Sequence, residues 1–113
     1  SPALFELVAE IEGNSALTVS TDSPVKMSLI DPKGKFTENM QDRILVNYNP
    51  LVGIYRLKIK PNQSGKGYLY VNRYETGKED KILTQEITLK KNKEANFLII
   101  NSPQQPPKII NFF

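Results

Sequence analysis

Three tyrosines offer the clearest binding chemistry in this 113-residue chain. Tyr68, Tyr70 and Tyr74 recur at even spacing, so on a β-strand their rings would lie on one face and could form a platform that stacks against sugars. The alternative is that two of the rings fill a hydrophobic core, because aromatic residues are common at packed strand positions. The sequence favours the core, and carbohydrate binding is the second interpretation.

A cationic row is the other candidate binding surface. Arg56, Lys58 and Lys60 alternate with large apolar residues. Since successive side chains of a strand point to opposite faces, the three cations would share the outer side of a sheet and could bind an anionic surface polymer. Alternating charge on the solvent side of a sheet is also ordinary, and it discourages edge-to-edge pairing. We expect a solvated face here, with polymer binding as the alternative.

The sequence offers few residues or motifs suited to catalysis. The chain has no cysteine and no histidine, which excludes thiolate and imidazole catalysis and zinc sites built on those ligands. It has no Gly-x-Ser-x-Gly elbow and no phosphate-binding loop, so a carboxylate pair brought together by the fold is the remaining route to catalysis. Its acidic residues are too scattered to supply the roughly six to eight oxygens that calcium needs. We expect a protein that is not an enzyme, with no catalytic residue, metal or cofactor.

The charge pattern excludes two further classes of partner. The net charge is +3, with 15 basic and 12 acidic residues, and no concentrated basic patch of the kind that binds nucleic acid is present. The longest apolar run is Phe97–Ile100, far below the roughly 20 residues that span a bilayer. We expect neither nucleic-acid binding nor membrane insertion.

The elements that must position these residues are β-strands. The clearest one follows the turn at Asn49–Pro50, where Tyr55, Leu57 and Ile59 would face a core. Similar segments recur about every ten residues, which is typical of a sandwich. The other predicted strands are Ala3–Ile11, Ala16–Ser20, Val25–Leu29, Arg43–Asn49 (alternating through Ile44, Val46 and Tyr48), Tyr68–Tyr74, Ile82–Lys90 and Ala95–Asn101. The sequence therefore predicts an all-β fold, an Ig-like antiparallel β-sandwich of about eight strands.

Turn signals separate these strands. Asp31-Pro32-Lys33-Gly34 fits a type I turn, and Phe36–Asp42 is predicted to be a loop or an irregular edge strand. Pro61–Gly67 and Glu75–Lys81 are predicted to be hairpin loops. Leu51, Gly53 and Tyr55 have the spacing of a tyrosine corner, in which the phenol hydroxyl bonds to the backbone of the preceding turn.

The composition changes after Asn101. Ser102–Pro107 holds three prolines in six residues, which favours an extended, semi-rigid spacer. The sequence therefore predicts a β-sandwich domain over residues 1–101, followed by a proline-rich linker and apolar tail over 102–113. The tail is too apolar to remain in water, so we expect it to pack against protein, with self-association as one result; its large apolar residues are Ile109, Ile110, Phe112 and Phe113.

Two stretches resemble a known family. One is Ser23–Lys35, which ends in the Asp-Pro-x-Gly turn; the other is Asn49–Ile59, with Pro-Leu-x-Gly-x-Tyr-x-Leu, followed by Gly67–Val71 with Gly-Tyr-x-Tyr. Together they are similar to the Ig-like, pre-peptidase C-terminal-type β-sandwich modules of bacterial secreted and cell-surface proteins, over about residues 23 to 100. These motifs mark turns and core positions, so the resemblance carries over no active site.

The resemblance implies an extracellular or cell-surface location and a non-catalytic role. We expect an accessory, spacer or interdomain packing module of a larger bacterial protein, whose partners are the neighbouring domains. The alternative is a carbohydrate- or surface-polymer-binding module that uses exposed tyrosines.

Overall fold

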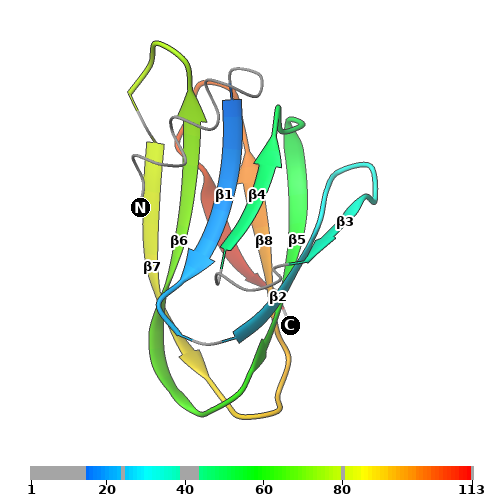
Figure 1. Cartoon of the computed structure of the whole chain (residues 1–113), viewed down its shortest axis with the longest axis vertical. Helices are drawn as coiled ribbons and strands as arrows, with labels where there is room; N and C mark the ends of the chain where they lie inside the picture. The colour runs from blue at the N-terminus through cyan, green and yellow to red at the C-terminus, as the bar shows by residue number, and fades with distance from the viewer. Residues whose placement is uncertain (1–14, 24, 39–43, 80, 113) are drawn as a thin grey trace.

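The structure is a computed structural model that describes residues 15–23, 25–38, 44–79 and 81–112. All regular structure in these ranges is β, and Figure 1 shows two layers of strands packed against each other. The predicted all-β antiparallel sandwich is confirmed. The strands are β1 (Ser15–Thr21), β2 (Val25–Ile30), β3 (Phe36–Glu38), β4 (Ile44–Tyr48), β5 (Gly53–Pro61), β6 (Gly65–Glu75), β7 (Lys81–Leu89), β8 (Ala95–Asn101) and β9 (Lys108–Phe112).

The strands form two antiparallel sheets. Sheet A has the order β4-β1-β6-β7, and sheet B has the order β3-β2-β5-β8-β9. Chain neighbours pair side by side in β2–β3, β6–β7 and β8–β9. The hairpin predicted over Pro61–Gly67 is wrong, because this segment carries the chain from sheet B to sheet A around one end of the sandwich (Figure 1). The apolar faces of β5 and β6 meet across the core rather than along a shared ladder.

The core lies between the two sheets and is built from the predicted alternation. Leu17 and Val19 of β1 are fully buried, on a strand whose other face is also largely buried. Leu57 and Ile59 of β5 are fully buried too, as expected for the inward positions of a half-exposed strand. The same holds on β2 and at the end of β7, where Met27, Leu29, Ile87 and Leu89 are buried.

The predicted strand Arg43–Asn49 corresponds to β4. It alternates through Ile44, Val46 and Tyr48, but its buried residue is Leu45. β4 pairs with β1 so that Leu45 lies opposite Val19, which points inward. Apolar residues occupy both faces of this strand, so periodicity alone could not choose between them.

Some predictions fall partly outside the described residues. The predicted strand Ala3–Ile11 lies wholly outside them. Phe36–Glu38 form the edge strand β3, which confirms the edge-strand interpretation for that part of Phe36–Asp42. In the part of the chain that the structure describes, no helix is long and apolar enough to cross a membrane.

The two sequence motifs pack against each other. The Gly34 N–H donates to the Asp31 carbonyl at 2.9 Å, which closes the predicted turn between β2 and β3. The Asp31 carboxylate also accepts the backbone N–H groups of Lys33 and Lys35, each at 2.8 Å. Gly53 has a φ of 137°, and a Cβ added there would lie 3.0 Å from Pro32 Cγ, so both its backbone conformation and the close approach require glycine.

The predicted tyrosine corner is confirmed. The Tyr55 hydroxyl donates to the Leu51 carbonyl at 2.7 Å. Asn101 Nδ2 donates to the same carbonyl at 2.9 Å, so this oxygen links the start of β5 to the end of β8. The loop before β5 is therefore held by two donors.

The segment after the proline-rich stretch is strand β9, which pairs antiparallel with β8 along its length. Ile109 lies opposite Ile99 and packs against the core, whereas Ile110 is 47% exposed on the outer face. The chain therefore returns to its own sandwich after residues 102–107. Phe113 lies outside the described residues.

A buried arginine fixes that return. Arg73 of β6 is 3% exposed and donates to the carbonyls of Ser102, Pro103 and Gln105 and to the Asn101 side chain. A proline-rich turn has few backbone donors and many free carbonyls, and a guanidinium with five N–H groups suits such a cluster. Arg73 thus ties sheet A to the connection between β8 and β9.

Candidate functional site

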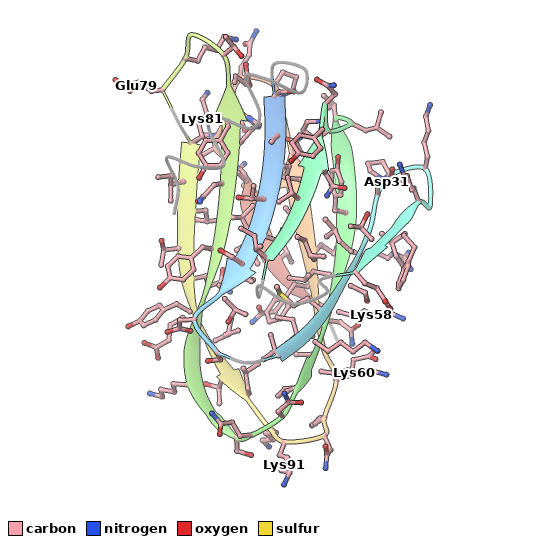
Figure 2. All side chains as sticks on the ribbon, viewed as in Figure 1. Asp31, Lys58, Lys60, Glu79, Lys81 and Lys91 are labelled. Atoms are coloured by element: carbon pink, nitrogen blue, oxygen red, sulfur yellow. The ribbon has the colours of Figure 1, made fainter. Side chains whose placement is uncertain are left out.

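The outer face of sheet B carries the predicted cationic row. Arg56, Lys58 and Lys60 are exposed on β5, and Figure 2 shows Lys58 and Lys60 on the same side of the molecule, pointing away from it. The neighbouring strand β2 places Lys26 directly opposite Lys60. Sequence reasoning missed Lys26, because its position beside the row depends on the β2–β5 register.

A hollow of about 220 Å³ lies on this face, where β2, β3 and β5 run side by side. Lys26, Lys58 and Lys60 line it together with the exposed ring of Phe36 and the hydroxyl-bearing Ser28, which is opposite Lys58. We call these residues the lysine hollow. It joins two members of the predicted row to residues from two other strands.

Two carboxylates also line the lysine hollow. Glu38 belongs to the edge strand β3, and Glu94 precedes β8 on the other side of β5. Among the described residues, no carboxylate forms a salt bridge with any of the three lysines. The hollow therefore has cations in its centre and acceptors at its two ends.

Aliphatic residues cover the rest of the same face. Ile54 is 53% exposed and lies opposite Ile100, and Leu98 lies between Arg56 and Ile110. This group continues onto β2 through Ile30, which is opposite Arg56. We call the five aliphatic residues the aliphatic band: Ile30, Ile54, Leu98, Ile100 and Ile110.

The structure separates the three candidate tyrosines. Tyr68 is 43% exposed and Tyr70 is partly exposed on the outer face of sheet A, with ring centroids 6.4 Å apart and planes inclined by 30°. Tyr74 is 1% exposed and packs with Ala16, so it cannot contact a ligand. One ring is fully buried, where the sequence favoured two, and a platform of two rings remains.

A further groove was not predicted. It has a volume of about 630 Å³ and lies beside the end of β7 and the start of β8. Ile87 and Phe97 give it an apolar wall, and Lys90, Lys93 and Glu86 are among its charged residues. No sequence motif marks this groove, because its walls come from two sheets whose relative position only the fold sets.

Two ionisable groups have shifted pKa values. Burial, and secondarily the charge of Asp31, raises the pKa of the Tyr55 hydroxyl to about 12. The Lys78 ammonium lies 3.0 Å from Glu75, and its hydrogen bond lowers the pKa of that carboxyl. Neither group faces the lysine hollow or the two exposed tyrosines, so both belong to the framework. No cluster of three or more potential metal ligands occurs among the described residues.

Comparisons of the chain with protein-family models, curated proteins and solved structures gave no match. The motif resemblance to bacterial accessory modules therefore stays a prediction.

Proposed function

We propose that the protein is a non-catalytic β-sandwich module of a larger bacterial secreted or cell-surface protein, and that it packs against a neighbouring domain through the outer face of sheet B. The observation that carries this proposal is the aliphatic band. Ile54 and Ile110 are each about half exposed on an otherwise regular sheet face. Burying a large aliphatic side chain contributes roughly 1.5–3 kcal/mol, so a partner surface gains by covering them.

The charge of the face indicates what that surface carries. Arg56 stands among the aliphatic residues, and Lys108 lies opposite Ile100 at the edge strand. Face-to-face packing of two copies would bring these cations together, which is unfavourable at short range. A different surface, apolar with one or two carboxylates, fits better. This favours a neighbouring domain over a second copy.

The test compares the chain alone with the chain joined to the sequence that flanks it in its parent protein. We expect Ile54→Asn combined with Ile110→Asn to lower the melting temperature of the joined protein by several degrees more than that of the isolated chain. Val52→Asn is the matched control, since Val52 is an exposed aliphatic residue in the loop before β5. Equal shifts in both proteins would contradict docking through the aliphatic band.

Glycan binding by Tyr68 and Tyr70 is the second candidate. Their stacked rings on the outer face of sheet A, at least partly exposed, favour it. The chain has five tyrosines and no tryptophan, so tyrosine fluorescence reports binding directly. Neutral oligosaccharides should change the emission of the wild type and of Tyr48→Ala, but not of the double variant Tyr68→Ala with Tyr70→Ala. A screen without any response in the wild type would remove this candidate.

A further inference from the structure

Two like charges lie directly opposite each other on the outer face of sheet B. Lys26 and Lys60 are register partners on β2 and β5, and Lys58 follows on the same face one pair further along. Directly opposite side chains have Cβ atoms roughly 4.5–5.5 Å apart, and like charges at this position destabilise a sheet. No salt bridge among the described residues joins these lysines to a carboxylate, and the three lysines outnumber the two carboxylates of the hollow, Glu38 and Glu94. An anion bound between the ammonium groups would remove the remaining repulsion.

We propose that the lysine hollow binds a carboxylated sugar unit of an acidic polysaccharide. Lysine ammonium groups donate charge-assisted hydrogen bonds to a carboxylate. The exposed ring of Phe36 stands at the same hollow and offers an apolar face to a pyranose ring. Ser28 adds a hydroxyl that can donate or accept. A volume of about 220 Å³ suits one such unit rather than a large ligand.

The two carboxylates decide between classes of polyanion. Glu38 and Glu94 accept hydrogen bonds, so they pair with sugar hydroxyl groups on either side of a single bound carboxylate. A densely charged phosphate polymer would place negative charge against both of them. The hollow therefore fits a ligand with one charge and several hydroxyl groups. The hollow adjoins the aliphatic band, since Phe36 lies opposite Ile30, but the two share no residue, and the inference does not rest on docking of a neighbouring domain.

The test is an NMR titration of the ¹⁵N-labelled chain with trigalacturonate, at low ionic strength. Shifts should concentrate on the amides of Ser28, Phe36 and Lys58. We expect the triple variant Lys26→Gln, Lys58→Gln and Lys60→Gln to bind about tenfold or more weakly, because charge-assisted hydrogen bonds are lost. The matched control replaces Lys33, Lys35 and Lys91 with glutamine, which changes the net charge equally and should leave affinity within about twofold.

A variant of one carboxylate gives a second readout, because it should change the affinity for a phosphate polymer and for a carboxylated sugar differently. Glu94→Gln should tighten the binding of tripolyphosphate, whereas it should not improve the binding of trigalacturonate, whose hydroxyl groups exchange a charged carboxylate acceptor for a weaker neutral amide oxygen. The single variant Lys60→Gln serves if the triple variant does not fold. Equal weakening in the lysine control, tighter binding of tripolyphosphate than of trigalacturonate by the wild type, or equal binding of uncharged trigalactose would each overturn the proposal.

Discussion

At the scale of single residues, Arg73 has the most demanding environment in the described chain. Its guanidinium is buried, yet its hydrogen bonds go mainly to neutral carbonyl groups of residues 102–105. Glu75 lies 3.4 Å from Nε, but without hydrogen-bond geometry, so this ion pair orients the charge more than it satisfies the N–H group. The energetic importance of Arg73 therefore lies in the carbonyl groups that it pairs.

Replacing Arg73 with methionine should destabilise the protein strongly. The change removes the donors and leaves the Ser102 and Gln105 carbonyls without these partners, so we expect a loss of roughly 2–5 kcal/mol, about 1–3 kcal/mol for each unpaired carbonyl. Urea unfolding followed by circular dichroism measures it. Arg56→Met is the control, because this exposed arginine should change stability by less than about 0.5 kcal/mol. Similar midpoints for both variants would contradict the role of Arg73 as the anchor of the β8–β9 connection.

Tyr55→Phe should cost about 1 kcal/mol, the usual net contribution of one hydrogen bond. The loss stays near this value because Asn101 still donates to the Leu51 carbonyl, so the acceptor is not left without a partner. The double variant Tyr55→Phe with Asn101→Leu removes both donors and should cost more than the sum of the single changes. Additive losses, measured by chemical denaturation, would show that the two donors act independently.

The raised pKa of the Tyr55 hydroxyl predicts a loss of stability at alkaline pH. Its pKa is raised from 10.0 to about 12 in the folded protein, chiefly by burial. Below pH 10 both states keep the proton and stability does not depend on this group. Above pH 10 the unfolded chain loses its proton first, so stability should fall as the pH rises toward 12. The fall should be shallower in Tyr55→Phe than in the wild type, as measured by urea unfolding at increasing pH.

At the scale of elements, β9 shows what one strand contributes through its two faces. Ile109 packs against the core, and its neighbour Ile110 points outward. Ile109→Asn should therefore destabilise by roughly 2–4 kcal/mol, since it buries an amide in an apolar site, whereas Ile110→Asn should cost less than about 0.5 kcal/mol. Thermal unfolding compares the two. The reverse order would show that the register of β9 along β8 is shifted by one residue.

The strands that the sequence predicts best are those with one polar and one apolar face. In β5, for example, the alternation assigns every side chain to the inner or the outer face. β4 was predicted as a strand, but both of its faces are apolar, so its buried face was decided only by its pairing with β1. β9 was missed because Pro106 and Pro107 precede it and suggested an exit from the domain. The acceptor cluster around Arg73 is invisible to periodicity, since it depends on a contact across about 30 residues of chain.

The candidate site likewise combines features that depend on local strand geometry with features that depend on strand pairing. Arg56, Lys58 and Lys60 were identified from spacing, because their common face depends only on local strand geometry. Lys26 and Phe36 entered the lysine hollow only through the register of β2 with its two neighbours. Surfaces made by one strand can thus be read from the sequence, whereas surfaces made by three strands cannot.

At the scale of the whole molecule, the two sheets present different outer faces. Sheet B combines the aliphatic band with most of the unpaired cations named above, while sheet A presents two stacked tyrosines. A partner that covers the aliphatic band leaves the two tyrosines on the outer face of sheet A uncovered. The edges of sheet B matter for this arrangement, because an uncovered apolar strand edge invites pairing with another chain.

Removing residues 108–113 should therefore cause the chain to self-associate. The deletion uncovers the free edge of β8 and the core residues Phe97 and Ile99, which β9 covers in the intact chain. Sedimentation velocity over a range of concentrations measures the result. Ile110→Asn in the full chain is the control, because it keeps β9 while removing the exposed aliphatic residue. If the full chain self-associates and this control abolishes it, the tail itself is the contact; if the truncated chain stays monomeric and equally stable, β9 does not protect the edge of sheet B.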